Sequence, residues 1–146
     1  MCTARTDLED ALLERFVPVD RQLAHLFPAP GADKYAVRVQ LGIYLANRDG
    51  RCWVKGCQGR TPTSRHEALI RQGHVQGWAL PRRIVVFNPI NCIALCVDHH
   101  NTASEPKAND VADWMLDYYG PDVVRWLRSL KFKTRHPMQG WIDQHS

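Results

Sequence analysis

No apolar run in this 146-residue sequence approaches the ~20 residues that a membrane-spanning helix requires, so we expect no membrane partner. The N-terminus has no apolar segment and turns acidic at Asp7, which argues against a secretory signal and favours a cytoplasmic location. The sequence also lacks internal repeats and low-complexity tracts, which excludes solenoid and fibrous proteins. With 45% hydrophobic and 23% charged residues, the composition is typical of a globular protein.

Five cysteines are an odd number, and without a secretory signal we expect no disulfide framework. Four residues separate Cys52 from Cys57, and two separate Cys96 from His99. Two short-spaced pairs of this kind can close a tetrahedral zinc site, and we predict that these four side chains bind a structural zinc ion. The alternative is two reduced buried cysteines and two surface histidines. Cys92 lies in an apolar run and is predicted to pack as a small apolar residue.

Positive charge is modest overall, with a net charge of +4, but it is concentrated in one part of the chain. Residues 48–83 contain eight Arg or Lys residues and only two Asp or Glu, a net charge of +6. A local positive field of this kind favours a polyanionic partner. Four arginines of this stretch are predicted to contact phosphates, the alternative being a solvated face: Arg65, Arg71, Arg82 and Arg83.

The hydrophobic pattern divides the chain into three parts. We predict an N-terminal helical arm over residues 1–47, a core rich in turns and short strands over 48–105, and C-terminal helices with a basic tail over 106–146. The chain after Lys131 is expected to form an arm, in which Trp141 docks on a surface that the sequence does not identify. The individual elements predicted are helices over 8–16, 21–27, 34–47, 111–119 and from 121, and strands over 65–70, 84–87 and 90–95.

A second group of residues carries potential chemistry beside the zinc ligands. His66 and Glu67 lie on a predicted strand, and His100 directly follows the predicted ligand His99. Zinc would fix these segments together, so that His66 or Glu67 could converge with His100 on a second, hard divalent cation. Such a cation stabilises the charge that develops on a phosphodiester, and a neighbouring imidazole or carboxylate can act as general base.

The order of these residues resembles the HNH nucleases, also called His-Me finger or ββα-metal nucleases. The resemblance covers residues 48–102, and its best-matching part is Asn91–Asn101. That segment is similar to the family's Asn-hydrophobic-Leu-Cys, two residues, Cys/His-His-Asn signature. The resemblance implies an α+β fold with a zinc-stabilised ββα-metal core and flanking helices.

The resemblance also implies roles for individual residues. Asn91 matches the Asn that braces the segment facing the general base, and His100 matches a ligand of the catalytic Mg²⁺ or Mn²⁺. The family's first motif is usually His-His or Asp-His, whereas this chain has His66-Glu67. In the preferred register His66 is the metal ligand and Glu67 the general base. In the other register His66 is the base, and Arg65 falls at the ligand position, where a cation is a poor ligand.

The activity that this resemblance implies is a metal-dependent endonuclease that nicks or cuts duplex DNA, in a phage or mobile-element setting. Two alternatives stay open. One is a zinc-binding adaptor that binds DNA or protein and whose nuclease site has decayed. The other is a nuclease subunit that is active only in a larger protein complex, which it would join through its terminal helices.

Overall fold

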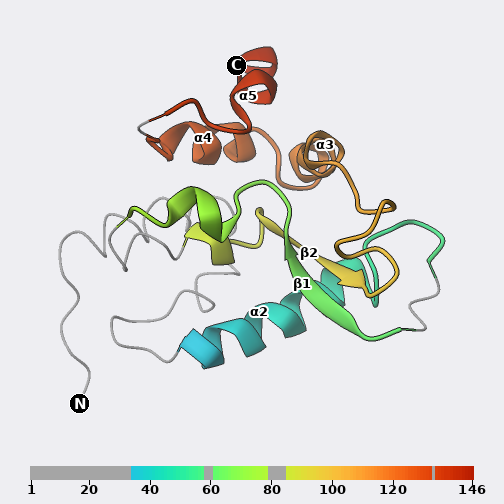
Figure 1. Cartoon of the computed structure of the whole chain (residues 1–146). Coiled ribbons are helices and arrows are strands. Elements are labelled where there is room, and N and C mark those ends of the chain that lie inside the picture. The colour runs from blue at the N-terminus through green and yellow to red at the C-terminus, as the bar shows by residue number, and fades with distance from the viewer. Residues whose placement is uncertain (1–33, 58–60, 79–84, 133) are drawn as a thin grey trace.

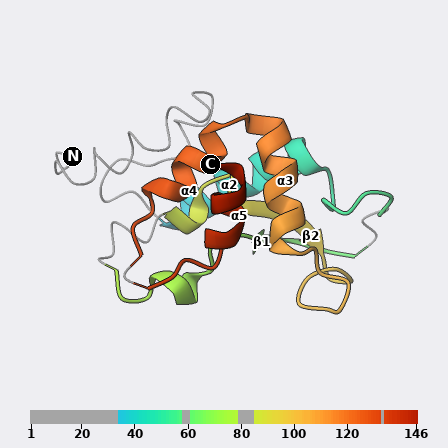
Figure 2. The ribbon, with the colours of Figure 1, turned by 90° about the horizontal axis from the view of Figure 1, so that it is seen from above.

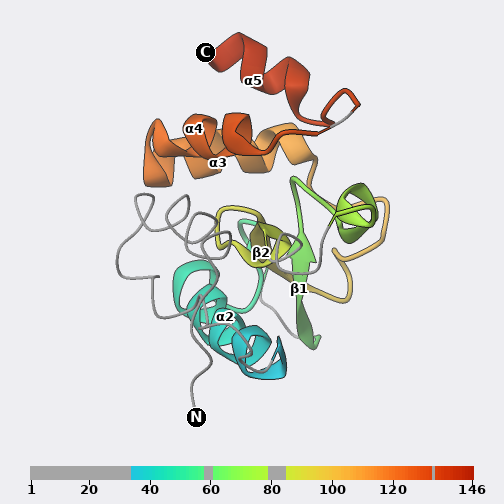
Figure 3. The same cartoon turned by 90° about the vertical axis from the view of Figure 1, so that its left-hand side faces the viewer.

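The computed structural model describes residues 34–57, 61–78, 85–132 and 134–146, and in these ranges it confirms the predicted α+β class. A two-stranded sheet lies in the middle, with α2 on one side and α3, α4 and α5 on the other (Figures 1 and 3). The helices are α2 (Lys34–Asp49), α3 (Ala108–Tyr119), α4 (Asp122–Ser129) and α5 (Gln139–His145). None of the described helices combines the length and apolar character needed to cross a membrane. The helices predicted over 8–16 and 21–27 lie outside the described residues.

The sheet pairs β1 (Thr63–Glu67) with β2 (Cys92–Cys96) in antiparallel register. β2 is buried along its whole length, and α2 packs against it. The strand predicted over 65–70 begins and ends earlier than expected. Residues 68–70 do not continue the strand pairing with β2, because the Asn91 side chain accepts the backbone N–H groups of Leu69 and Ile70 at 3.2 and 2.6 Å.

The strand predicted over 84–87 is wrong, since residues 85–87 form a 3₁₀ turn. Val85, Val86 and Phe87 are all buried, so the apolar run belongs to the core although it is not a strand. The Asn88 N–H closes the turn on the Val85 carbonyl at 3.1 Å, and Pro89 follows without an N–H to donate. A short buried apolar run has no periodicity that separates a strand from such a turn.

Helix α2 extends two residues beyond its predicted end, to Asp49, and Gly50 with a φ of 72° then ends it. The residues of this helix that the sequence predicts to face inward are Tyr35, Val39, Leu41, Tyr44 and Leu45. Leu41 and Leu45 are buried, whereas Val39 is 45% exposed, so the prediction for Val39 is wrong.

The basic tail is not an extended arm, because it contains helix α5. Trp141 is only 3% exposed, and its indole Nε1–H donates to Asp113 Oδ1 of α3 at 2.8 Å. Seen from above, α5 lies between α4 and α3 (Figure 2). Trp141 therefore docks as expected, and the surface that holds its indole is α3 of the same chain. Gly120, with a φ of 80°, allows the sharp change of direction between α3 and α4.

His136, just before α5, is a buried histidine that favours the neutral form. Its Nδ1 accepts the backbone N–H of Met138 at 2.9 Å, and its ring packs edge-on against Phe132. Within the described residues its Nε2 has no hydrogen-bond partner. Burial, with a smaller contribution from His74, lowers the pKa of His136 to about 4. Protonation of this imidazole therefore favours the unfolded chain, where its pKa is ordinary.

We expect His136 to make the protein less stable as the pH falls from about 6.5 to about 4, by up to roughly 3 kcal/mol. His136→Asn keeps an acceptor for the Met138 N–H and does not titrate, so its unfolding free energy should fall less over this range. Chemical denaturation at several pH values measures the difference. All other titratable groups are the same in both proteins, so the comparison isolates His136. Parallel curves for the two proteins would contradict the prediction.

Candidate metal centre and histidine pocket

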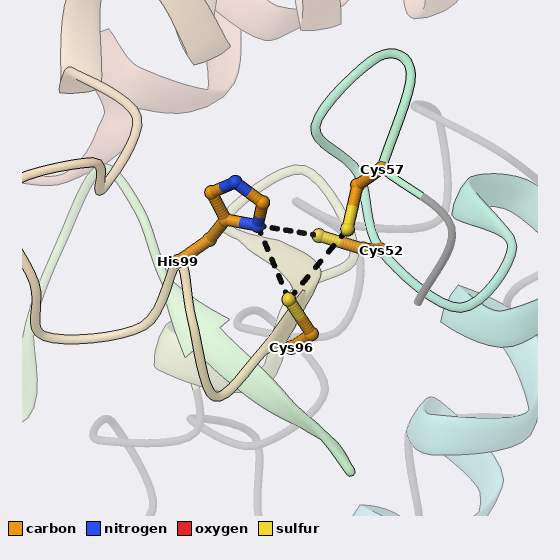
Figure 4. A group of neighbouring side chains, drawn as sticks. All are labelled: Cys52, Cys57, Cys96 and His99. Atoms are coloured by element: carbon orange, nitrogen blue, oxygen red, sulfur yellow. Dashed lines mark hydrogen bonds between the residues drawn. The ribbon is translucent and has the colours of Figure 1, made fainter. Parts of the chain in front are cut away.

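Three cysteines and one histidine meet at one end of the sheet (Figure 4). Cys52 and Cys57 come from the loop after α2, Cys96 ends β2, and His99 lies in the following turn. Their ligand atoms all lie within 4.8 Å of one another. Within the described residues, these four side chains form the group that lies close enough together to hold a metal ion.

The local backbone explains why these four residues meet. The Trp53 N–H donates to the Ala94 carbonyl at 2.7 Å, which places the loop after α2 beside β2. Gly56 has a φ of 83° and turns the loop so that Cys57 faces back toward Cys52. On the other side, the backbone N–H of His99 donates to the Cys96 carbonyl at 3.0 Å and closes a tight turn.

The distances between these ligand atoms fit zinc. Bonds of about 2.3 Å to sulfur and about 2.0 Å to nitrogen at a tetrahedral angle separate two sulfurs by ~3.8 Å and sulfur from nitrogen by ~3.6 Å. The Sγ atoms of Cys57 and Cys96 are 3.7 Å apart, and Cys52 Sγ is 3.5 Å from His99 Nδ1. The distance from Cys96 Sγ to His99 Nδ1 is shorter, 3.1 Å. The four predicted zinc ligands are therefore placed so that they can bind a metal such as zinc.

The thiol of Cys96 favours the form that binds zinc. The neighbouring Thr61 hydroxyl, against the effect of burial and with help from His99 and Cys57, lowers its pKa to about 6. The thiolate is the species that ligates metals.

The pKa of Cys92, at the other end of β2, is shifted in the opposite direction. Burial raises the pKa of Cys92 to about 12, and its thiol donates to the Val86 carbonyl, so it packs in the core as predicted.

The imidazole of His66, on β1, packs edge-on against the imidazole of His100, in the turn after β2. His66 is only 5% exposed, and its ring centroid lies 5.1 Å from that of His100 with an interplanar angle of 71°. Ser64, two residues before His66 on the same face of β1, hydrogen-bonds His100 Nδ1 at 2.8 Å. His100 directly follows the cluster ligand His99, so the turn after β2 carries one side chain to each site. The structure thus brings together the two histidines that sequence reasoning paired.

Glu67 lies apart from this pair, because neighbouring residues of a strand point to opposite faces. Its carboxylate is 3.7 Å from the guanidinium of Arg65, and it accepts the backbone N–H of Gln72 at 3.1 Å. The Arg65 guanidinium also lies over the ring of Phe87, 4.5 Å from its centroid. Arg65 and Glu67 therefore form a pair of their own on the face of β1 opposite His66.

Asn91 is fully buried and satisfies all of its side-chain hydrogen bonds. Its Oδ1 accepts two backbone N–H groups, and its Nδ2 donates to the carbonyls of Ile70 and Val86 at 2.7 and 3.0 Å. Its own carbonyl accepts the Ala68 N–H at 2.7 Å. Asn91 thus fixes the segment that directly follows His66 and Glu67.

Sequence reasoning missed Glu105. Its Oε1 lies 3.4 Å from His66 Nε2 and 3.2 Å from the Arg71 guanidinium, and its Oε2 accepts the Asn101 N–H at 2.6 Å. Burial lowers the pKa of His66, and the charge of Glu105 opposes that effect. The only sequence signal for Glu105 is its position five residues after His100, which is close enough for the chain to fold back.

An open pocket of about 300 Å³ lies between these groups. Its lining joins both faces of the end of β1 to the turn after β2: Arg65, His66, Glu67, Arg71, Gln72, His100 and Asn101. Two of the four arginines predicted to contact phosphates therefore line it. The other two, Arg82 and Arg83, lie outside the described residues. The pocket combines imidazole, carboxylate and guanidinium groups, a set suited to an anionic substrate and a divalent cation.

Comparison with known proteins adds no assignment to this geometry. No protein-family model, no curated protein and no solved structure matches the chain significantly. What the described residues establish is a mixed α+β protein with a cluster of three cysteines and a histidine that can hold a metal ion.

Proposed function

We propose that this protein is a metal-dependent endonuclease of the HNH type that hydrolyses phosphodiester bonds of duplex DNA. The observation that carries the proposal is the approach of His66 and His100 in an arginine-lined pocket beside the Cys/His cluster. The sequence order of these residues is that of the HNH signature. Phosphodiester hydrolysis needs a cation at the scissile phosphate and a base for water, and this pocket offers ligands and bases for both.

Each side chain has a role in this proposal. His66 and His100 hold Mg²⁺ or Mn²⁺, which supplies charge stabilisation for the phosphate and its leaving oxygen. The zinc-binding cluster fixes His99 and with it the orientation of His100. Arg65 and Arg71 contact the phosphates on either side of the cleaved bond.

The general base comes from the same pocket. In the preferred register it is Glu67, which takes a proton from the attacking water while His66 stays on the metal. Asn91 holds the backbone after Glu67 and thereby keeps β1 in place. In the alternative register His66 is the general base, and His100 is then the one remaining proposed ligand of the catalytic cation.

The test is conversion of supercoiled plasmid by zinc-loaded protein with Mg²⁺ or Mn²⁺, against EDTA. We expect His100→Ala to lower the cleavage rate by about 100-fold or more, because a ligand of the catalytic cation is lost. Zinc content and melting temperature should stay unchanged. His145→Ala, which replaces a histidine of α5 that does not line the pocket, is the matched control and should cleave normally. Cleavage by folded His100→Ala at the wild-type rate would contradict the proposed role of His100 as a ligand of the catalytic cation.

Two further variants identify the base. If Glu67 is the base, Glu67→Gln loses cleavage but still binds Mn²⁺, whereas His66→Ala loses both. If His66 is the base, His66→Ala loses cleavage and retains Mn²⁺ binding through His100. The two registers therefore predict different pairs of results.

A zinc-binding adaptor with a decayed nuclease site is the second candidate. The contacts of Glu67 favour it, because an ion pair with Arg65 and a hydrogen bond from the Gln72 N–H are structural roles that need no catalysis. This candidate predicts bound zinc and DNA or protein binding, with no cleavage under any metal. If the protein is a subunit that is active only in a larger complex, the isolated protein should not cleave DNA, and cleavage should appear once its partner is added.

A further inference from the structure

We propose that Ser64 is a positioning residue that fixes the imidazole of His100, an inference that rests on the proposed function. Ser64 is an exposed residue of β1, and neither the sequence signature nor the Cys/His cluster points to it. What points to it is its hydroxyl, which forms a hydrogen bond with His100 Nδ1 at 2.8 Å. This bond decides which nitrogen of His100 is available to a ligand in the pocket.

The strand register and the turn after β2 bring the two side chains together. Ser64 pairs with Leu95, the last residue but one of β2. The backbone N–H of His100 donates to the Cys96 carbonyl at 3.0 Å, which keeps His100 close to the same end of the sheet. The turn thus fixes the backbone of His100 but leaves the orientation of its ring to be fixed by side chains.

Two side chains from the same face of β1 hold this ring. Ser64 bonds to its Nδ1, and the buried His66 packs edge-on against it with ring centroids 5.1 Å apart. A half-turn of the His100 ring about its bond to Cβ would put a carbon where Nδ1 lies, and the hydrogen bond would be lost. Ser64 therefore selects one of the two ring orientations and leaves Nε2 as the nitrogen that a ligand in the pocket can reach.

The same hydrogen bond selects a tautomer. A neutral imidazole carries one proton, so Nε2 has a lone pair for a cation only if that proton is on Nδ1. The oxygen of a serine hydroxyl can accept the Nδ1–H, as the groups behind metal-binding histidines commonly do. In this arrangement His100 donates from Nδ1 to Ser64 Oγ, which prepares its Nε2 to bind Mg²⁺ or Mn²⁺.

The first test is the tautomer of His100 in the zinc-loaded protein, read from imidazole ¹⁵N chemical shifts by NMR. The spectra are recorded without other divalent cations, at a pH at which imidazoles are neutral, and His100→Ala identifies the signals. We expect the proton on Nδ1 in the wild type and in Ser64→Thr, which keeps the hydroxyl, and at least partly on Nε2 in Ser64→Ala. A wild-type His100 protonated at Nε2, or the same tautomer in Ser64→Ala as in the wild type, overturns the inference.

The second test is titration with Mn²⁺, followed through the EPR signal of the free ion. We expect Ser64→Ala to raise the Kd for Mn²⁺ by about tenfold, because the group that orients a metal-binding histidine is lost, and Ser64→Thr to stay within about threefold of the wild type. Thr63→Ala is the matched control, because it removes a hydroxyl from the neighbouring exposed residue, on the other face of β1. Its Kd should also stay within about threefold of the wild type. Bound zinc and the melting temperature report whether each variant is folded.

The two proposals fail in different ways. If the wild type binds Mn²⁺ and cleaves plasmid, and Ser64→Ala binds Mn²⁺ equally well, Ser64 has no positioning role and the nuclease site stands. An equal rise of the Kd in Ser64→Ala and Ser64→Thr also overturns the role of Ser64, because the hydroxyl is then not what matters. A wild-type protein that neither binds Mn²⁺ nor cleaves DNA overturns the proposed function together with this inference.

Discussion

Cys96→Ala is expected to abolish zinc binding and to unfold the centre of the protein. Cys96 ends β2 and lies within reach of both Cys57 and His99, so its loss opens the cluster on two sides. The free energy of structural zinc binding is about 10–16 kcal/mol, and it is available to folding only while the ligand set is complete. That amount is comparable to the whole stability of a domain, about 5–15 kcal/mol.

The position of the cluster explains why this loss should spread. Between residues 51 and 57 the described part of the loop that carries Cys52 and Cys57 has no helix or strand, and the Trp53 N–H joins it to the Ala94 carbonyl of β2. Trp53 also packs edge-on against Trp114 of α3 at 5.8 Å. Without zinc this loop is expected to detach, which would expose Trp53 and one face of β2.

Cys92→Ala is the matched control, because Cys92 and Cys96 are buried residues at the two ends of one strand. Cys92 gives one hydrogen bond to Val86, and we expect its removal to cost about 1–2 kcal/mol without loss of zinc. Zinc content by a colorimetric chelator and thermal unfolding by circular dichroism measure both variants. Equal zinc content and equal melting temperatures in the two variants would show that the four side chains are a chance cluster.

The cluster of three cysteines and one histidine was predictable because its information is local. Cys52 and Cys57 are separated by a single turn, as are Cys96 and His99, so spacing alone shows that each pair can share an ion. The approach of His66 and His100 needed one further step, namely that the cluster fixes β1 beside the turn after β2. The order of the HNH-like motif residues along the chain indicated this step.

Long-range contacts could not be predicted in the same way. Glu105 has no motif, and only the fold of the turn after His99 brings it to His66. Residues 84–87 have the composition of a strand, yet the buried Val85–Phe87 segment forms a turn because Asn88 and Pro89 end it. In the tail, Trp141 indicated a docked segment, but the identity of Asp113 as its partner depends on tertiary structure.

Arg48 is the clearest case of a residue whose role only the structure reveals. It contributes to the positive charge of residues 48–83, which favours a polyanionic partner, yet its side chain is only 1% exposed. It binds both carboxylate oxygens of Asp49, which is fully buried, so the two charges cancel inside the protein. Any positive surface charge of this stretch must therefore come from its other basic residues.

The guanidinium of Arg48 joins three elements. It donates to the carbonyls of Pro89 and Cys92 near β2 and to the Tyr119 hydroxyl of α3 at 2.9 Å. Asp49 in turn accepts the Ala94 N–H of β2 at 2.9 Å. Burial alone would lower the pKa of Arg48, but Asp49 and Tyr119 raise it overall, so the side chain stays charged.

We expect Arg48→Met to lower the unfolding free energy by about 3–5 kcal/mol, because it leaves the Asp49 carboxylate buried without a counter-charge. Chemical denaturation of the zinc-loaded protein measures the change. Arg128→Met, at an exposed position of α4, is the control and should change stability by less than about 0.5 kcal/mol. An Arg48→Met variant within about 1 kcal/mol of the wild type would contradict this account.

The double variant Arg48→Met, Asp49→Asn separates the charge from the hydrogen bonds. The amide oxygen introduced by Asp49→Asn can still accept the Ala94 N–H, and no buried charge is left, so part of the lost stability should return. The part that does not return measures the bonds from Arg48 to Pro89, Cys92 and Tyr119. Because Cys92 and Ala94 lie on the strand that ends in Cys96, we also expect Arg48→Met to weaken zinc binding, whereas Arg128→Met should not. Unchanged zinc affinity in Arg48→Met would mean that the cluster and the buried ion pair stabilise the strand independently.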